Sequence, residues 1–239
     1  MTDRSRYPLG KKPPRLDGAL ALTTYADVLP KPKPSVDNWA GVPATPMFQN
    51  DVKSNCTFAG AGHAEQEWSW WGKPYRQPTD AQLDVGYELL SPNDDGCVMR
   101  DVLDYWRKTG IAGNKIAAFV KVNPLNTAHV KLAIDLFGGL YTGVALPLSA
   151  QTQNWCWTVK TGPSAVLGSW GGHCIWIPKY NSQRVFDITW GEELRMSWTF
   201  FRKYVDECWA IVDQSWLGAD KVSPAGLNVA QLLADAKAL

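Results

Sequence analysis

Helix-type and strand-type patterns divide this chain into two halves, and that division restricts its fold more than any other feature. Apolar residues repeat with a helical period in three segments, at about 56–67, 97–109 and 126–138. Strand-type patterns follow at 140–146, at 173–177 and 184–190 as a hairpin, and at 208–213, with a short helix at 198–206 before the last strand. Because the helices precede the antiparallel strands, we expect an α+β fold rather than a doubly wound sheet.

The composition indicates one globular domain that needs no metal or disulfide to fold. The chain has 239 residues, of which 45% are hydrophobic, and its formal charge is +1. A core of this size buries about three quarters of the surface of the unfolded chain. The five cysteines form no Cys-x-x-Cys pair, which argues against a disulfide framework and a zinc ribbon. We therefore expect no cofactor and no metal.

The charge balance and the absence of apolar runs also restrict partners and location. A net charge near zero gives no reason to expect nucleic acid or an anionic membrane as a partner. The sequence contains no run of about 18 apolar residues, and its first residues lack the apolar core of a signal peptide. We expect an intracellular protein without a transmembrane segment.

The two ends of the chain differ in composition from its middle. Residues 1–45 are rich in Pro and Lys, which favours extended backbone, and we call them the arm. Residues 1–40 carry a charge of +3 from seven basic and four acidic residues, against −2 for the rest from seventeen and nineteen. We expect the arm to be held either by its own domain, residues 46–215, or by a neighbouring subunit. Residues 216–239 are predicted to form an amphipathic helical tail.

Cys56 is the candidate nucleophile because it opens the first predicted helix. Unpaired N–H groups and the helix dipole favour a thiolate at that position. By itself the position is also compatible with a buried structural cysteine. Of the three histidines, His173 begins a strand after two glycines and is the candidate base. His129 lies within a helix, and His63 lies two helical turns beyond Cys56, about 10 Å away and too far for direct proton transfer.

Asn50 lies six residues before Cys56 and is the candidate oxyanion donor. Its amide is placed to reach over the N-terminus of the Cys56 helix. Asn-Asp is also common in turns, so a purely structural role remains open at this position.

Taken in order, these residues resemble the papain-like cysteine peptidases. The resemblance rests on Asn50, Cys56-Thr57-Phe58-Ala59, Gly172-His173 and Thr189-Trp190-Gly191, and it covers about residues 45–213. It implies a papain-like fold, with the nucleophile helix in the helical half, and hydrolysis of peptide or isopeptide bonds in a peptide or protein substrate.

A group of uncharacterised papain-like proteins of bacteriophages and prophages is more similar still. That similarity rests on six short motifs: Asn50-Asp51, Asn55-Cys56-Thr57, Gly171-Gly172-His173, Thr189-Trp190-Gly191, Met196-Ser197-Trp198 and Tyr204-Val205-Asp206-Glu207. It implies a viral origin and a location in the cytoplasm of a bacterial host or in a virion. Neighbouring virion subunits are then possible partners of the arm or of the C-terminal helix.

The sequence departs from the peptidase pattern at the residue that orients the catalytic histidine. Ile188 stands where the family has Asn, and isoleucine makes no hydrogen bond to an imidazole. Asp187 is one residue earlier. A shift of one residue on a regular strand turns the side chain to the opposite face, so Asp187 orients His173 only if a bulge or a strand end intervenes.

Two hypotheses follow. In the first, the protein is a cysteine hydrolase in which Cys56 attacks, His173 transfers the proton, Asp187 orients the ring, and Asn50 binds the oxyanion. In the second, it is a virion structural or accessory protein, a head or tail component, with a papain-like fold and a degenerate site. A Cys56 that is buried, or beyond hydrogen-bond reach of His173, favours the second hypothesis.

Overall fold

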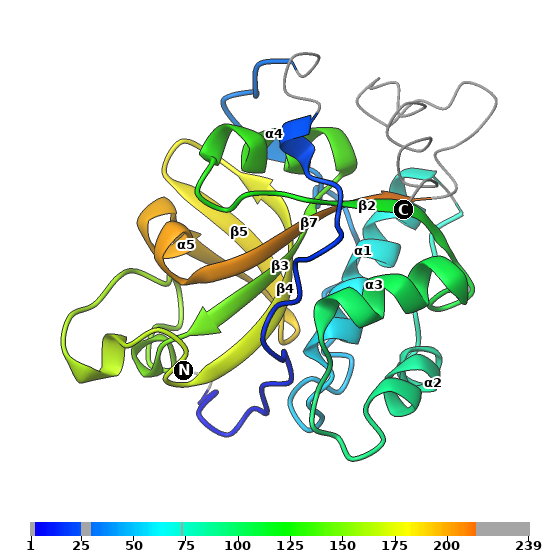
Figure 1. Ribbon diagram of the computed structural model, residues 1–239, viewed down its shortest axis with the longest axis horizontal. Coiled ribbons are helices and arrows are strands. Elements are labelled where there is room, and N and C mark those ends of the chain that lie inside the picture. Colours follow the sequence, from blue (N-terminus) through cyan, green and yellow to red (C-terminus); the bar gives the residue numbers. More distant parts are fainter. Residues whose placement is uncertain (1–2, 25–29, 73, 214–239) are drawn as a thin grey trace.

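A computed structural model describes residues 3–24, 30–72 and 74–213. The predicted C-terminal helix at 216–239 lies outside these ranges. Figure 1 shows a layer of helices beside a twisted sheet. The predicted elements occur in the predicted order, and the structure adds a helix at 80–90 and strands at 36–37, 116–121 and 192–197. The α+β architecture is therefore confirmed, with helices first and an antiparallel sheet after them. No helix within the described ranges is long and apolar enough to span a membrane.

Three helices form the layer against one face of the sheet. They are α1 (Cys56–Gly72), α2 (Asp80–Leu90) and α3 (Met99–Lys108). The first and third match predicted segments. Helix α2 was not predicted, although Thr79 and Gln82 form a capping box at its start, which is a sequence signal for a helix N-terminus.

The sheet is antiparallel throughout, with its strands in the order β2-β7-β3-β4-β5-β6. The strands are β2 (Ile116–Lys121), β3 (Leu140–Leu146), β4 (Gly171–Tyr180), β5 (Arg184–Thr189), β6 (Glu192–Ser197) and β7 (Val205–Asp213). A two-residue strand, β1 (Val36–Asp37), pairs with β4. Two further helices, α4 (Thr127–Phe137) and α5 (Trp198–Tyr204), lie on the side of the sheet away from α1. Strand β4 is central and begins next to α1, so it connects the two layers.

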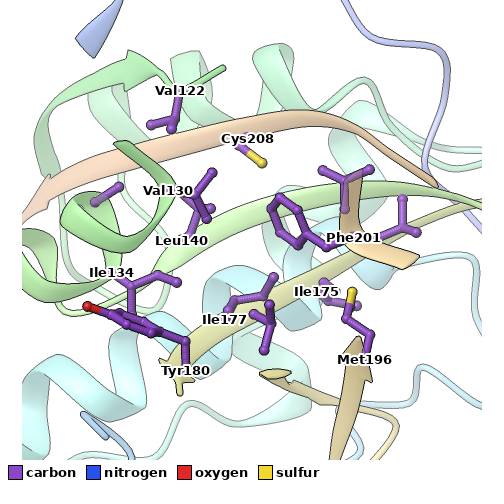
Figure 2. Packing of buried hydrophobic residues seen from close by; sticks show 14 of the residues in the cluster. Val122, Val130, Ile134, Leu140, Ile175, Ile177, Tyr180, Met196, Phe201 and Cys208 are labelled. Atoms are coloured by element: carbon purple, nitrogen blue, oxygen red, sulfur yellow. The ribbon is translucent and has the colours of Figure 1, made fainter. Parts of the chain in front are cut away.

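Side chains of β4 alternate between two apolar cores. Cys174 and Trp176 belong to the core between the sheet and α1. Ile175 and Ile177 belong to the core on the other face, which Figure 2 shows packed with residues of α4, α5 and β7. This period-2 alternation is what a strand buried on both faces requires.

The start of the arm lies across the junction of the two layers, as the dark blue segment in Figure 1 shows. The N–H of Lys11 donates to the carbonyl of Gly172 at 3.1 Å, and the N–H of Lys12 donates to the carbonyl of Cys97 at 2.9 Å. The N–H of Cys97 donates to the carbonyl of Gly10 at 2.8 Å. Residues 10–12 are thus held by their own domain, in extended form and between its two halves.

Packing in the core on the α4 and α5 side of the sheet leads to a testable prediction about stability. Ile177 is fully buried there, and truncation to alanine leaves a cavity. We expect Ile177→Ala to lower the free energy of unfolding by about 2–5 kcal/mol in urea denaturation. Val85→Ala is the control, because Val85 is exposed on α2; its effect is expected to stay within about 0.5 kcal/mol. An equal loss in both variants contradicts the packing described above.

Candidate active site

Cys56 is the first residue of α1 and is completely buried. Burial raises the pKa of its thiol above the usual value. Hydrogen bonds from the backbone of Cys174 and Gly10 and the charge of Lys11 act in the opposite direction without outweighing burial. The helix start that favours a thiolate therefore does not produce one here, and the sulfur is held as a neutral thiol at neutral pH.

The arm contributes directly to this burial. The backbone of Gly10, in the arm, is one of the groups that lower the pKa of the Cys56 thiol against the effect of burial. The carbonyl of Gly10 accepts a hydrogen bond from the N–H of Cys97. A Cβ atom on Gly10 would lie 1.6 Å from the carbonyl oxygen of Ser54, so this close approach requires glycine. A buried Cys56 favours the second hypothesis, the structural or accessory protein, and so does the absence of a hydrogen bond between Cys56 and His173. The groups around the thiol include Gly10 of the arm, however, and not only residues of the two core layers.

His173 is also completely buried, near the start of β4. Its Nε2 atom lies 2.7 Å from Oγ1 of Thr189, and its ring stacks on Trp190 with centroids 4.2 Å apart and planes at 19°. Burial lowers the pKa of His173 to about 3, so the ring is neutral at neutral pH. A neutral ring that donates from Nε2 to Thr189 keeps its lone pair on Nδ1. Nδ1 makes no hydrogen bond to any described residue, Cys56 included.

Thr189 makes the hydrogen bond that we expected from Asp187. It is the last residue of β5, and Trp190 after it has a positive φ of 48° as the chain turns. Ile188, at the position of the family's Asn, points into the core beside α1 and pairs with Trp176 in register. A hydroxyl one residue after the expected position, at the end of the strand, thus holds the His173 ring.

Asp187 is completely buried, and neither of its carboxylate oxygens bonds to a side chain within the described residues. Burial raises its pKa to about 8, and the charge of Glu193 adds to that effect while Arg4 opposes it. Asp187 is therefore mostly protonated at neutral pH and makes no hydrogen bond to His173.

Asn50 lies beside the start of α1, as predicted, and is buried. Its Nδ2 atom donates to Oδ1 of Asn55 at 3.3 Å, and Nδ2 of Asn55 donates to the carbonyl of Phe48 at 2.8 Å. These bonds fasten the turn before α1, in which Phe48 and Gln49 have positive φ values of 53° and 58°. The turn role is thus observed, and the oxyanion role stays a prediction.

The other two histidines have different surroundings from His173. His63 is buried between the rings of Trp39 and Phe48, and burial lowers its pKa to about 3. It belongs to the core. His129 is half-buried in the first turn of α4. Among the described residues, no cluster of three or more His, Cys, Asp or Glu side chains is arranged to hold a metal ion.

Sequence reasoning missed two contributors to this site, Thr189 and the arm. In the sequence, Thr189 attracts attention only as part of the Thr189-Trp190-Gly191 motif. Its hydroxyl, which can form a hydrogen bond to an imidazole, is the feature that could have identified it. For the arm, the signal was its charge of +3 against −2 for the remainder. Five of its basic residues form ion pairs with the domain: Arg4 with Glu192, Lys11 with Asp206 and Glu207, Lys12 with Asp95, Arg15 with Asp101, and Lys33 with Asp135.

No protein-family model and no curated protein matches the chain. Solved structures of cysteine proteases do match its fold. Xylellain, a cysteine protease from Xylella fastidiosa, aligns with a TM-score of 0.69 and 15% identity over 89% of this chain and 98% of that one. Procathepsin B from Trypanosoma congolense aligns with a TM-score of 0.63 and 9% identity over 89% and 88%. The recombinant stem bromelain precursor aligns with a TM-score of 0.60 and 14% identity over 90% and 80%.

At these identities the likeness concerns the fold alone. The chain has the fold of papain-like cysteine proteases, with α1 beginning at Cys56 in the helical half and an antiparallel sheet in the C-terminal half.

The hydrogen bond between His173 and Thr189 predicts a difference between two substitutions. Thr189→Val keeps the shape of the side chain but leaves buried Nε2 of His173 without its partner. We expect it to lower the free energy of unfolding by about 1–3 kcal/mol. Thr189→Ser keeps the hydroxyl and is expected to lose less. Urea denaturation at pH 7 measures both, and a serine variant as unstable as the valine variant contradicts this role of the hydroxyl.

The environment of Asp187 predicts a dependence on pH. Because its folded-state pKa is raised to about 8, ionisation opposes folding, and stability is lost as the pH rises from the unfolded pKa towards 8. Asp187→Asn removes the ionisation. Its stability relative to the parent is expected to rise by about 1.4 kcal/mol per pH unit over that window. Urea denaturation between pH 4 and pH 9 tests this; a stability difference that does not change with pH excludes a buried carboxyl with a raised pKa.

Proposed function

From the papain-like fold and this geometry, we propose that the protein is a cysteine peptidase whose cleft is filled by its own arm. The observation that carries the proposal is the position of residues 10–12. They lie extended against Cys56, with backbone hydrogen bonds to Cys97 on one side and Gly172 on the other. A groove that binds extended backbone on both edges of a cysteine at a helix N-terminus is suited to a peptide substrate.

In the proposed reaction, a peptide replaces the arm and its carbonyl carbon approaches the sulfur of Cys56. Nδ1 of His173 takes the thiol proton as the sulfur attacks, and the ring then gives that proton to the leaving amine. The backbone N–H of Cys56 and the amide of Asn50 bind the oxyanion. Water hydrolyses the resulting thioester and restores the thiol. Thr189 is the positioning residue for the ring in this scheme, in place of Asp187.

The arm-bound form is proposed to be latent. The backbone of Gly10 acts on the thiol of Cys56, and the carbonyl of Gly10 accepts a hydrogen bond from the N–H of Cys97. The low pKa of His173 and the raised pKa of Cys56 both come from burial. Displacement of the arm readmits water to the site and so favours the thiolate–imidazolium pair on which such enzymes depend.

The alternative function, a virion structural or accessory protein, makes the opposite prediction about Cys56. It treats the thiol as a packed cysteine that stays unreactive when the arm is displaced. The contacts of residues 10–12 with their own domain explain how the arm is held without invoking a second subunit. A phage origin, virion partners, and location in a bacterial cytoplasm or a virion stay predictions from the sequence.

Alkylation of Cys56 tests the proposal with two matched lysine variants. Lys11→Met removes the cation from a buried ion pair, leaving Glu207 without its partner, and should release the arm. Lys12→Met removes a partly exposed pair with Asp95, which contributes little. We expect Cys56 to react with iodoacetamide at pH 6 at least about tenfold faster in Lys11→Met than in the parent or Lys12→Met.

The acceleration should disappear in Lys11→Met with His173→Ala. Mass spectrometry of the labelled protein identifies the cysteine, and circular dichroism verifies that each variant is folded. If Cys56 in folded Lys11→Met reacts no faster than the other four cysteines, or reacts only on unfolding, the peptidase proposal fails and the alternative of a structural or accessory protein is supported.

A further inference from the structure

The side chain of Lys11 enters an acidic pocket beside the candidate active site. Only 1% of the side chain is exposed. Its Nζ atom lies 2.9 Å from Oδ2 of Asp206 and 3.2 Å from Oε1 of Glu207. Burial opposes a charge at this place, but the two carboxylates outweigh it and raise the pKa of Lys11. The pocket therefore holds a lysine in its charged form.

The pocket belongs to the domain and not to the arm. Asp206 and Glu207 lie at the start of β7, a strand in the middle of the sheet. Oε2 of Glu207 accepts a hydrogen bond from Nε1 of Trp209 at 2.9 Å, which leaves Oε1 directed at Lys11. Gly143, on the neighbouring strand β3, provides the space, because a Cβ atom there would lie 2.1 Å from Cε of Lys11.

The carboxyl of Glu207 needs a cation. Its side chain is completely buried, and burial raises its pKa while Lys11 opposes that effect. Within the described residues, Lys11 is the cation that forms an ion pair with Glu207. A buried carboxylate that loses its partner is strongly disfavoured. Without the arm, Asp206 and Glu207 would keep their places on β7 but would lack the cation that pairs with them.

We propose that Asp206 and Glu207 form a specificity pocket for a lysine or arginine side chain of the peptide substrate, within two residues of the scissile bond. This inference rests on the proposed peptidase function. A substrate that lies between Cys97 and Gly172, as residues 10–12 do, brings a side chain to the place of Lys11. In strand-like binding the backbone provides affinity and side-chain pockets provide selectivity.

The space next to the pocket extends the inference to arginine. A cavity of about 390 Å³ is lined in part by Asp206, Glu207, Cys208 and Leu16. Of the two residues that hold Lys11, Asp206 has a partly exposed side chain beside this cavity, whereas the carboxyl of Glu207 is completely buried. A guanidinium, which is longer and binds carboxylates with two parallel hydrogen bonds, has room to extend in this direction.

Cleavage profiling with full-length variants tests the pocket. Lys11→Met provides the background in which the arm is released. A complex peptide mixture is digested with it, with Lys11→Met/Glu207→Gln, and with Lys11→Met/Glu88→Gln, and the cleaved bonds are identified by mass spectrometry. Glu88 is the matched control, because it is an exposed carboxylate on α2 that pairs with Lys53. We expect Lys and Arg to be enriched within two residues of the cleaved bonds.

The enrichment should fall by at least about tenfold with Glu207→Gln and persist with Glu88→Gln. Cleavage without basic enrichment, or with enrichment unchanged in Glu207→Gln, overturns the pocket and leaves the peptidase proposal standing. Absence of cleavage by a folded Lys11→Met variant overturns the peptidase proposal, and with it the assignment of substrate.

A binding measurement separates the two failures without relying on turnover. Fluorescently labelled peptides with the sequence of residues 8–14, carrying either Lys or Met at the position of Lys11, are titrated into Lys11→Met/Cys56→Ala. We expect the lysine peptide to bind at least about tenfold more tightly, and Glu207→Gln to remove the difference. Equal affinities for the two peptides overturn the pocket, whatever the state of the catalytic site.

Discussion

The two-sided burial of β4 is the constraint on which the rest of the structure depends. Because the strand is covered on both faces, its side chains must alternate between two cores, Cys174 and Trp176 on one side and Ile175 and Ile177 on the other. That alternation places His173 on the face of Trp190, while the backbone of Cys174 contacts the thiol at the start of α1. A slip of one residue in this strand would exchange the two sets and dismantle both the cores and the site.

Burial has a second consequence, which concerns charge. In the arm-bound form the thiol of Cys56, the ring of His173 and the carboxyl of Asp187 are all held neutral at neutral pH, because each lies out of water without an adequate counter-charge. At Lys11 burial also opposes the charge, but two carboxylates outweigh that effect, so the side chain is held in its charged form. The charged Lys11 that acts on the thiol of Cys56 thus belongs to the arm, and its partners Asp206 and Glu207 belong to the domain.

The arm and the domain are complementary in charge, which their compositions suggest but do not locate. The basic residues of the arm have acidic partners on β6, β7, α3, α4 and the loop before α3. Most of these pairs are partly exposed and contribute little each, whereas the pair of Lys11 and Glu207 is buried. Under the proposed function, a peptide of similar chemistry would displace the arm and take over these contacts.

The sequence by itself determined the α+β class, the helix that begins at Cys56, the strand that carries His173 and the order of both along the chain. These features follow from local periodicity and from residue types at helix and strand starts, which act over a few residues. Only the tertiary structure decided that Thr189 and not Asp187 bonds to His173, because a strand end changes direction in a way that no alternation pattern encodes. It also decided that Gly10 covers Cys56 and that Lys11 lies against Glu207. Such contacts join residues far apart in the chain, and their energy depends on burial, which exists only once the two layers have packed together.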